Sequence, residues 1–348
     1  MLPNELPHEE LLVRRGRRSG ITIAVAVHST ALGPALGGCR IWRYPSWTDG
    51  VADALRLAEA MTAKAAIAGL AHGGGKTVAA LPPGTVLDVD GRRALLLDIG
   101  DAVDALGGRY WTGPDVGTGP ADMAVVGERT ERVFCRPEAD GGTGDSSPAT
   151  ADGVLAALEV LGRRLDADRG LAGLRVAMSG LGHVGTLVAR RLAAAGARLV
   201  VSDIDPTRRA VAQECGADWA DPEEVLVADV DVLVPAALGG QLTPELVDRL
   251  RCRAVAGPAN NQLAADAVAD LLHARGIVWA PDYLVSAGGV VGTTAREIDG
   301  LGPHEARARV RGIGETLDAL LDEAAERGES PHRTAQRRIT ERLSAVPA

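Results

Sequence analysis

Residues 174–185 read Leu-Arg-Val-Ala-Met-Ser-Gly-Leu-Gly-His-Val-Gly, and this stretch decides the fold of the chain around it. Its first six residues are mostly apolar, as in a buried strand, and a helical pattern over residues 184–195 follows directly. Glycines at positions 180, 182 and 185 have the spacing of the turn that joins strand and helix in a dinucleotide-binding unit. The first makes the tight turn, the second lets a pyrophosphate approach the main chain, and the third packs the helix against the strand.

The start of this helix is the predicted phosphate site, because its unpaired N–H groups and its dipole favour anions. We expect cofactor contacts from five loop residues: Gly180, Gly182, His183, Val184 and Gly185. Asp203 ends the next predicted strand, where a carboxylate would hydrogen-bond the ribose 2′-hydroxyl and repel a 2′-phosphate. The sequence therefore favours NAD, although Arg208 and Arg209 follow closely and leave NADP open. A purely structural glycine turn is the alternative.

Apolar runs and amphipathic stretches alternate through the second half of the chain. Further strands are predicted at residues 197–202, 230–234, 254–256 and 276–279, with a helix at residues 206–214 between the first two. This order is typical of an α/β fold with a parallel sheet covered on both faces. We therefore expect a Rossmann NAD-binding domain.

The length of 348 residues suggests two domains. Residues 139–148 are rich in Gly, Ser, Asp and Pro, which predicts the hinge. We expect an α/β domain for substrate binding and oligomerisation at residues 1–146 and the NAD-binding domain at residues 147–324, with a cleft between them. The last helix, within residues 325–348, is a candidate to pack on the first domain.

The composition excludes several classes of function. With 46% apolar and 24% charged residues and a net charge of −9, the chain resembles an ordinary globular protein and lacks the basic character of a nucleic-acid-binding one. No apolar run is long enough for a membrane span and the first residues do not resemble a signal peptide, so we expect a cytoplasmic protein without membrane partners. Four cysteines without CxxC spacing predict neither a metal site nor a disulfide framework.

Two lysines lie within residues 61–78, a segment almost devoid of other charge. An ammonium group is costly to bury among Ala, Ile and Gly, and burial lowers the pKa of a lysine toward that of a general base. Helical periodicity over residues 47–69 places Lys64 on the inner face, one turn beyond Met61. Lys76 follows three glycines, which would let a ligand approach the main chain, and precedes a strand predicted at residues 78–81.

This segment has two other interpretations. Two solvated lysines beside a glycine-rich turn remain an alternative. A phosphate-binding P-loop fails on its glycine spacing and on the helix, rather than strand, that precedes it.

Asp115 lies among glycines and a proline in residues 110–117. An Asp beside Gly commonly makes only an Asx turn. Near two lysines, however, an aspartate would complete a charge-balanced proton-transfer site. His72, between the lysines, fits a local turn role better than a substrate contact.

Several short motifs, in the same order along the chain, resemble the amino-acid dehydrogenases that act on glutamate, leucine, phenylalanine and valine. They span nearly the whole sequence, at residues 33–40, 64–66, 73–76, 113–117, 148–150, 236–240, 259–263 and 281–283. Residues 110–115, 272–276 and 290–297 resemble the phenylalanine branch, with the leucine and valine branches as alternatives. The resemblance implies an NAD-dependent, reversible oxidative deamination of an L-amino acid to its 2-oxo acid and ammonia, by a homo-oligomer.

The resemblance also implies roles for single residues. Lys64 would hold the substrate carboxylate, Lys76 would be the general base that activates water, and Asp115 would shuttle protons with it. Further substrate contacts are implied for Gly37, Gly38, Met61, Ser286 and Val290. Further cofactor contacts are implied for Thr150, Ala236, Ala237 and Asn260, with Asn261 as an additional candidate.

Ser286 departs from the family pattern, which has Asn at this position. Serine lacks the amide donor, so an altered substrate, a weakened activity or a noncatalytic NAD-binding homologue stay open. Residues 290–294 are small or apolar and offer no basic partner for a second carboxylate, so we expect an apolar amino acid rather than glutamate. A 2-hydroxy-acid dehydrogenase would instead use a His base with an Arg clamp, and the lysine pair argues against it.

Overall fold

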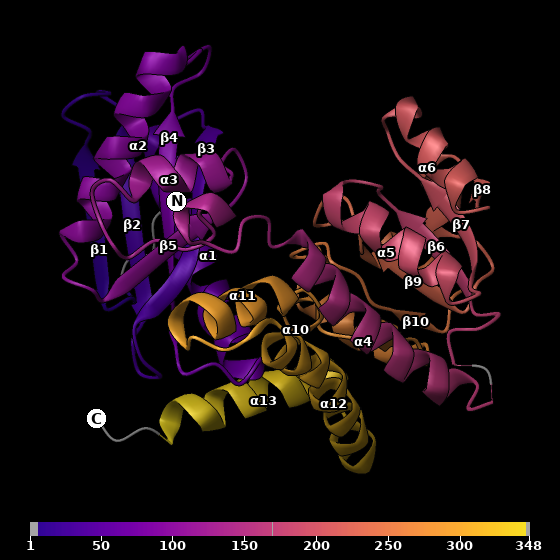
Figure 1. Ribbon diagram of the computed structural model, residues 1–348. Coiled ribbons are helices and arrows are strands. Elements are labelled where there is room, and N and C mark those ends of the chain that lie inside the picture. The colour runs from indigo at the N-terminus through magenta and orange to yellow at the C-terminus, as the bar shows by residue number, and fades with distance from the viewer. Residues whose placement is uncertain (1–5, 169, 346–348) are drawn as a thin grey trace. The chain divides into compact units, whose positions relative to one another are not determined.

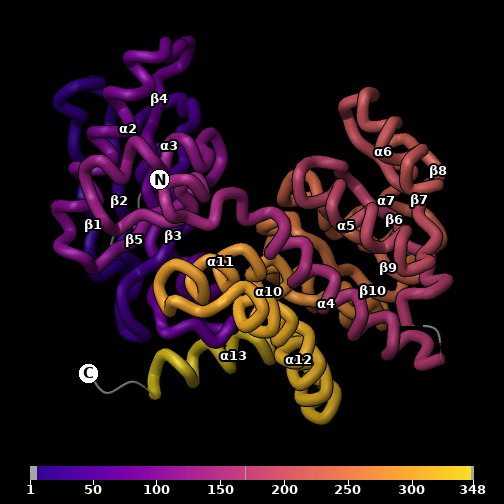
Figure 2. Tube along the Cα trace, in the orientation of Figure 1, coloured from indigo at the N-terminus to yellow at the C-terminus, as the bar shows by residue number. Residues whose placement is uncertain are grey.

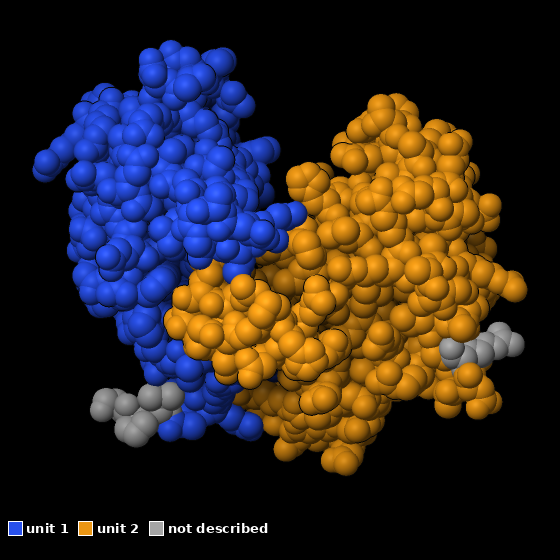
Figure 3. Space-filling model, in the orientation of Figure 1, with its two compact units in different colours: residues 1–145, 339–348 blue, residues 146–338 orange. Residues whose placement is uncertain are grey.

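The computed structural model describes residues 6–168 and 170–345, which divide into two compact units (Figure 3). Residues up to Asp145 and from Ile339 onward belong to unit 1, and Ser146–Arg338 form unit 2. The division after Asp145 lies in the segment expected to be the hinge. Near the C-terminus, residues 325–338 belong to unit 2 and residues 339–345 to unit 1, where Arg342 donates hydrogen bonds to the carbonyl oxygens of Ala66 and Leu70.

A five-stranded sheet forms the middle of unit 1 (Figure 1). In spatial order its strands are β1 (Glu10–Arg15), β2 (Thr22–Ser29), β4 (Gly73–Leu81), β3 (Ala35–Arg43) and β5 (Tyr110–Pro114). β2 pairs antiparallel with β1 and β4, whereas β3 runs parallel to both β4 and β5. The three parallel strands therefore place Lys76 of β4, the middle of β3 and the end of β5 next to one another.

Helices cover both faces of this sheet. On one face lies α1 (Trp47–Ile67), which begins at a capping box formed by Ser46 and Asp49. α2 (Val89–Asp104) and α3 (Pro120–Val126) lie on the other face. The α1 face buries Val51, Ala54, Leu55 and Ala58 against Ala24, Ala26 and Val78, and the opposite face buries Leu95, Ile99, Met123 and Val126 with Ile23, Val25 and Ala79.

The first unit corrects one prediction. The helix expected at residues 47–69 is present and ends at Ile67, but the strand expected at residues 78–81 begins at Gly73. Gly73, Gly74, Gly75 and Lys76 are therefore buried strand residues and not part of a flexible turn. The apolar residues 78–81 indicated only the second part of this strand. Its first part was missed because glycine has low strand propensity, and because apolar and polar residues do not alternate in a strand that is buried on both faces.

A six-stranded parallel sheet forms the middle of unit 2. Its order is β8 (Asp218–Trp219), β7 (Arg198–Ser202), β6 (Arg175–Ser179), β9 (Val232–Pro235), β10 (Ala254–Val255) and β11 (Val278–Trp279). The direction of this order reverses between β6 and β9, as in doubly wound Rossmann sheets. The α/β class and the Rossmann architecture predicted from the sequence are confirmed.

The helices of unit 2 alternate with these strands, as the Cα trace shows for β6, α5 (His183–Ala194) and β7 (Figure 2). The helix expected at residues 206–214 is a 3-10 turn, Pro206–Arg208, followed by α6 (Arg209–Glu214). The remaining helices of unit 2 are α4 (Ser147–Leu165), α7 (Pro222–Leu226), α8 (Pro244–Arg249), α9 (Ala267–Ala274), α10 (Asp282–Val285), α11 (Gly288–Thr293) and α12 (Pro303–Arg327). The last helix, α13 (Pro331–Ser344), begins in unit 2 and continues into unit 1 from Ile339.

Candidate active site

Lys76 and Asp115, which lie far apart in the sequence, form an ion pair in unit 1. Nζ of Lys76 lies 2.9 Å from Oδ2 of Asp115, and only 6% of the lysine side chain is exposed, against 22% of the aspartate. Lys76 extends from β4, and Asp115 is the residue after β5. The structure thus brings together the predicted base and its predicted partner.

Arg40 on β3 contacts the same carboxylate oxygen, and the sequence analysis did not assign it a role. Its Nε donates to Oδ2 of Asp115 at 2.9 Å, and its Nη1 donates to Oδ2 of Asp53 at 2.9 Å. Burial opposes the ionisation of Asp115, but the positive charges of Lys76 and Arg40 outweigh it and lower the pKa of this carboxyl to about 2. A signal was present, since strand periodicity places Arg40 on the same face as Gly38, two residues earlier.

Gly38 leaves the space in which this ion pair lies. A Cβ atom at Gly38 would lie 2.7 Å from Cβ of Asp115 and 3.2 Å from Nζ of Lys76. The neighbouring Gly37 has a different environment, because its Cβ would lie 1.8 Å from the carbonyl oxygen of Gly75. Gly37 therefore permits strand packing, and its contact with a substrate stays a prediction.

The three glycines before Lys76 also serve packing. A Cβ atom would lie 1.7 Å from the carbonyl oxygen of Ser29 at Gly73, 2.0 Å from the amide nitrogen of Thr62 at Gly74, and 2.6 Å from the ring of Tyr110 at Gly75. Protein atoms fill these sites, so the expectation that the glycines open a path for a ligand is corrected. Glycine is needed here because other backbone comes too close for any side chain.

Lys64 and Met61 lie in the last turns of α1, and both are half-buried. They flank Thr62, the residue against which Gly74 packs, so α1 lies close to β4 at the level of these side chains. His72 is buried, and its Nδ1 lies 3.2 Å from the carbonyl oxygen of Pro34. That contact fits the local turn role expected for His72.

The glycine loop of unit 2 has three distinct environments. A Cβ at Gly180, where φ is +111°, would lie 2.7 Å from the amide nitrogen of Ala237, and a Cβ at Gly185 would lie 2.3 Å from the carbonyl oxygen of Gly180. At Gly182, by contrast, no atom lies within 4 Å of the Cβ position. Gly182 and His183 are exposed at the start of α5. The loop therefore offers open main chain at a helix N-terminus, as a pyrophosphate requires.

Asp203 fixes this loop from the end of β7. Its Oδ2 accepts a hydrogen bond of 2.6 Å from the amide of Leu181, and its Oδ1 accepts one of 2.9 Å from the amide of Asp205. Ala236 and Ala237 directly follow β9, where the strand order reverses. The predicted cofactor residues of the loop thus gather at the carboxyl ends of β6, β7 and β9.

A second group of predicted residues in unit 2 surrounds Ser286. This side chain is buried, donates a hydrogen bond of 2.7 Å to the carbonyl oxygen of Asp282, and lies 3.3 Å from Oδ1 of Asn260. A Cβ at Gly289 would lie 2.6 Å from Oγ1 of Thr150. Val290 is half-buried on α11. Ser286 and Asn260 are therefore neighbours, as a shared site requires.

Gln262 supports the loop that carries Asn260 and Asn261, and the sequence analysis missed it. Its amide Nε2 donates to the carbonyl oxygens of Gly257 and Ala259 at 2.9 and 3.1 Å, and its Oε1 accepts a bond of 3.1 Å from Nε1 of Trp279. Asn261 has a positive φ of 53°, a conformation that Asn tolerates better than most residues. A completely buried glutamine with every polar group paired explains how this irregular loop is held.

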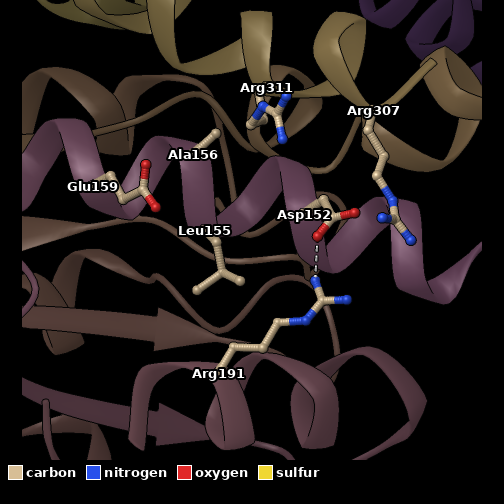
Figure 4. Close-up of a pocket in the computed structure, with 7 residues that line it drawn as sticks. All are labelled: Asp152, Leu155, Ala156, Glu159, Arg191, Arg307 and Arg311. Atoms are coloured by element: carbon tan, nitrogen blue, oxygen red, sulfur yellow. Dashed lines mark hydrogen bonds and ion pairs between the residues drawn. The ribbon is translucent and has the colours of Figure 1, made fainter. Parts of the chain in front are cut away.

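Unit 2 also has a pocket of about 350 Å³ outside this group (Figure 4). It lies among α4, α5 and α12, where Arg191 pairs with Asp152 at 2.6 Å and the side chains of Arg307 and Arg311 extend from α12. None of the predicted site residues lines it. Over residues 6–168 and 170–345 there is neither a metal-binding cluster of His, Cys, Asp and Glu nor a helix that could cross a membrane.

Two family models match the chain. Residues 10–132 match the Glu/Leu/Phe/Val dehydrogenase dimerisation domain, and residues 201–298 match the Glutamate/Leucine/Phenylalanine/Valine dehydrogenase family. These ranges contain the Lys76 and Asp115 pair in unit 1 and the Asn260 and Ser286 pair in unit 2.

Similar proteins agree over almost the whole length. Leucine dehydrogenase from Thermoactinomyces intermedius is 38% identical, over 97% of this chain and 92% of its own. Valine dehydrogenase from Streptomyces coelicolor is 40% identical, again over 97% and 92%. The crystal structure of L-tryptophan dehydrogenase from Nostoc punctiforme superposes with a TM-score of 0.81 at 34% identity, over 97% of this chain and 96% of that one. The chain therefore belongs to the Glu/Leu/Phe/Val dehydrogenase family of amino-acid dehydrogenases.

Proposed function

We propose that the protein catalyses the reversible, NAD-dependent oxidative deamination of an apolar L-amino acid to its 2-oxo acid and ammonia. The observation that carries this proposal is the buried contact between Lys76 and Asp115 in the space that Gly38 leaves. A cation and an anion are held there 2.9 Å apart, the cation on the buried strand β4 and the anion directly after β5. Acid–base catalysis requires groups positioned in this way.

In the proposed reaction Lys64 binds the substrate carboxylate as an ammonium group. Lys76 is the base that activates the water which attacks the imino carbon, and Asp115 is its partner in proton transfer. The further proposed substrate contacts are Gly37, Gly38 and Met61 in unit 1 and Ser286 and Val290 in unit 2. These roles follow from the family resemblance, and the short distance from Lys76 to Asp115 supports the central pair.

The cofactor is NAD, which accepts the hydride from the substrate Cα. The open main chain at Gly182, the start of α5 and the neighbouring Ala236 and Ala237 are suited to its pyrophosphate. Asp203 is suited to a ribose hydroxyl and would repel a 2′-phosphate. Thr150 and Asn260 are the proposed contacts for the nicotinamide end.

An apolar substrate is supported by the residues of α11 and by similar proteins. Val290, Val291 and Thr293 are apolar or small. The relatives named above are described as leucine, valine and tryptophan dehydrogenases, all of which act on amino acids with apolar side chains. A homo-oligomer is proposed because the model that matches residues 10–132 describes a dimerisation domain. The cytoplasm remains the compartment predicted from the sequence.

The test is an assay of purified protein with NAD and a panel of L-amino acids, followed by NADH absorbance. We expect NADH with leucine, valine, phenylalanine or tryptophan and none with Lys76→Ala. Arg93→Ala, an exposed residue paired with Glu128 on the surface of unit 1, is the matched control and should retain activity.

Three results would change the proposal. If none of the amino acids tested led to NADH formation, the enzyme function would be overturned and the noncatalytic homologue favoured. Unchanged turnover in Lys76→Ala would overturn its role as the base. A loss of activity confined to Lys64→Ala would exchange the roles of the two lysines.

A further inference from the structure

Arg40 connects two carboxylates with the two sides of its guanidinium group. Nε contacts Asp115, and Nη1 contacts Asp53. We propose that Arg40 is a positioning residue that, together with Lys76, fixes the orientation of the Asp115 carboxylate through its Oδ2 atom. This inference rests on the proposed function, in which Asp115 shuttles protons, and it assigns to Arg40 the role of holding that carboxylate in place.

The two oxygens of Asp115 have different surroundings. Oδ2 receives both Lys76 and Arg40 at 2.9 Å. No hydrogen bond to Oδ1 is donated by any residue in the described parts of the chain, 6–168 and 170–345. The Asp115 side chain as a whole is 22% exposed. Arg40 and Lys76 therefore hold the carboxylate by one of its two oxygens.

Asp53 binds the other side of the Arg40 guanidinium group. Oδ2 of Asp53 accepts hydrogen bonds from Arg40 at 2.9 Å and from the hydroxyl of Tyr44 at 2.7 Å, and Oδ1 accepts one of 2.8 Å from Arg56. Burial opposes the ionisation of Asp53, but the donors Tyr44, Arg56 and Arg40 outweigh it and lower the pKa of Asp53. Burial also raises the pKa of Tyr44, so its hydroxyl remains a donor. The guanidinium plane is therefore fixed at both ends.

Lysine could not replace Arg40 in this role. A guanidinium presents several donors in one rigid plane and can direct two of them at separate carboxylates, whereas an ammonium is a point charge on a flexible stem. The arginine thus fixes the orientation of the Asp115 carboxylate as well as its charge.

Asp115 is ionised near neutral pH. Burial opposes its ionisation, but the positive charges of Lys76 and Arg40 outweigh burial and hold its pKa at about 2. The titratable and charged groups around it come from all elements that pack there: Lys76 on β4, Arg40 and Cys39 on β3, Tyr110 on β5, and Arg92 on α2 and Asp122 on α3 near Cys39. Burial raises the pKa of the Cys39 thiol to about 12, so it adds no charge.

The first experiment compares Arg40→Gln, Arg40→Lys and, as matched control, Arg56→Gln, which contacts Asp53 but not Asp115. The KM for the amino acid should rise about tenfold or more in Arg40→Gln, the size expected when a charged hydrogen-bond network is lost. The KM for NAD should not change, since Arg40 belongs to unit 1 and the glycine loop belongs to unit 2. The acidic limb of the activity profile should move to higher pH, because loss of a positive charge makes protonation of neighbouring groups easier.

Arg40→Lys should restore the acidic limb of the activity profile to its wild-type pH but should not restore the KM. Lysine supplies the positive charge but lacks the planar arrangement of donors that arginine has. Arg56→Gln should leave both values unchanged. Melting temperatures identify any variant that fails to fold. If folded Arg40→Gln kept the wild-type KM for the amino acid and the wild-type pH profile, the inference would be overturned.

A second measurement separates this inference from the proposed function, because it needs no activity. The carboxyl 13C signal of Asp115, assigned by its absence in Asp115→Asn, should stay that of an ionised group down to about pH 4 in the wild type. In Arg40→Gln it should titrate about 1 to 3 pH units higher. That shift in a protein without dehydrogenase activity would overturn only the proposed function. Identical titration in both proteins would overturn the role of Arg40.

Discussion

Substitution of Gly38 by alanine tests whether the empty position on β3 is what the ion pair requires. The new Cβ would lie 2.7 Å from Cβ of Asp115 and 2.9 Å from the carbonyl oxygen of Pro114. Carbon atoms in contact are separated by about 3.5 Å, so Asp115 must move by about 0.8 Å, because the backbone of Pro114 has little freedom to yield. A movement of this size would disturb the contact of 2.9 Å between Asp115 and Lys76.

The expected effects on rate and on stability differ in size. A misplacement near 1 Å at a catalytic group lowers the rate by about 100-fold. Overpacking of this kind costs about 1–3 kcal/mol of the free energy of unfolding, which leaves a typical domain folded. Gly38→Ala should therefore be a folded protein with a severely reduced kcat.

The assay compares kcat and melting temperature for Gly38→Ala and Gly119→Ala. Gly119 precedes α3 in the same unit, has a φ of −149°, and has no atom within 4 Å of its Cβ position. The control should keep most of its activity. Wild-type kcat in a folded Gly38→Ala protein would refute the idea that this space is part of the active site.

Three further predictions concern other residues. Asp203→Asn keeps an acceptor for the amide of Leu181 but loses its charge, so the ratio of kcat/KM for NADP to that for NAD should rise about tenfold; an unchanged ratio would contradict the role of Asp203 in cofactor choice. Ser286→Asn supplies the amide found in the family and should lower the KM for the amino acid by about tenfold, the value of one hydrogen bond to a charged group; a KM that rises in a folded variant would show that serine suits a different substrate. Asp115→Asn should be about 2 kcal/mol less stable to urea than the wild type at pH 6, because the folded pKa of about 2 lies below the ordinary value of 3.8. Since a depressed pKa stabilises the fold above the unfolded value, this difference should shrink as the pH falls from about 4 toward 2, and a difference that stays constant over that range would contradict the ion pair.

Regular elements were predicted well where local patterns decide them. The glycine spacing after residue 179 and the alternation of apolar runs gave the Rossmann sheet of unit 2, because its central strands are largely buried. The helix that carries Lys64 was predicted within two residues at its C-terminal end, from its periodicity and from Gly69 as a stop signal. Lys76 and Asp115 were chosen for their unusual neighbours, and the structure places them in contact.

Other features depend on contacts between distant segments. The strand assignment of Gly73–Gly75 could not follow from propensity, since those glycines are explained only by Ser29, Thr62 and Tyr110 on other elements. Arg40 was missed because its importance arises from Asp53 and Asp115, which are 13 and 75 residues away. Gln262 was missed for the same reason, because its role depends on hydrogen bonds with Gly257, Ala259 and Trp279 that only the folded chain brings together.

The contact between Gly74 and Thr62 has a consequence for how unit 1 tolerates change. At this point the approach of α1 to β4 is limited by main-chain atoms, since a Cβ at Gly74 would lie 2.0 Å from the amide nitrogen of Thr62 and 2.6 Å from the carbonyl carbon of Met61. Any side chain at position 74 would therefore push the helix that carries Lys64 away from the strand that carries Lys76. A library of substitutions at Gly74 should yield almost no active members.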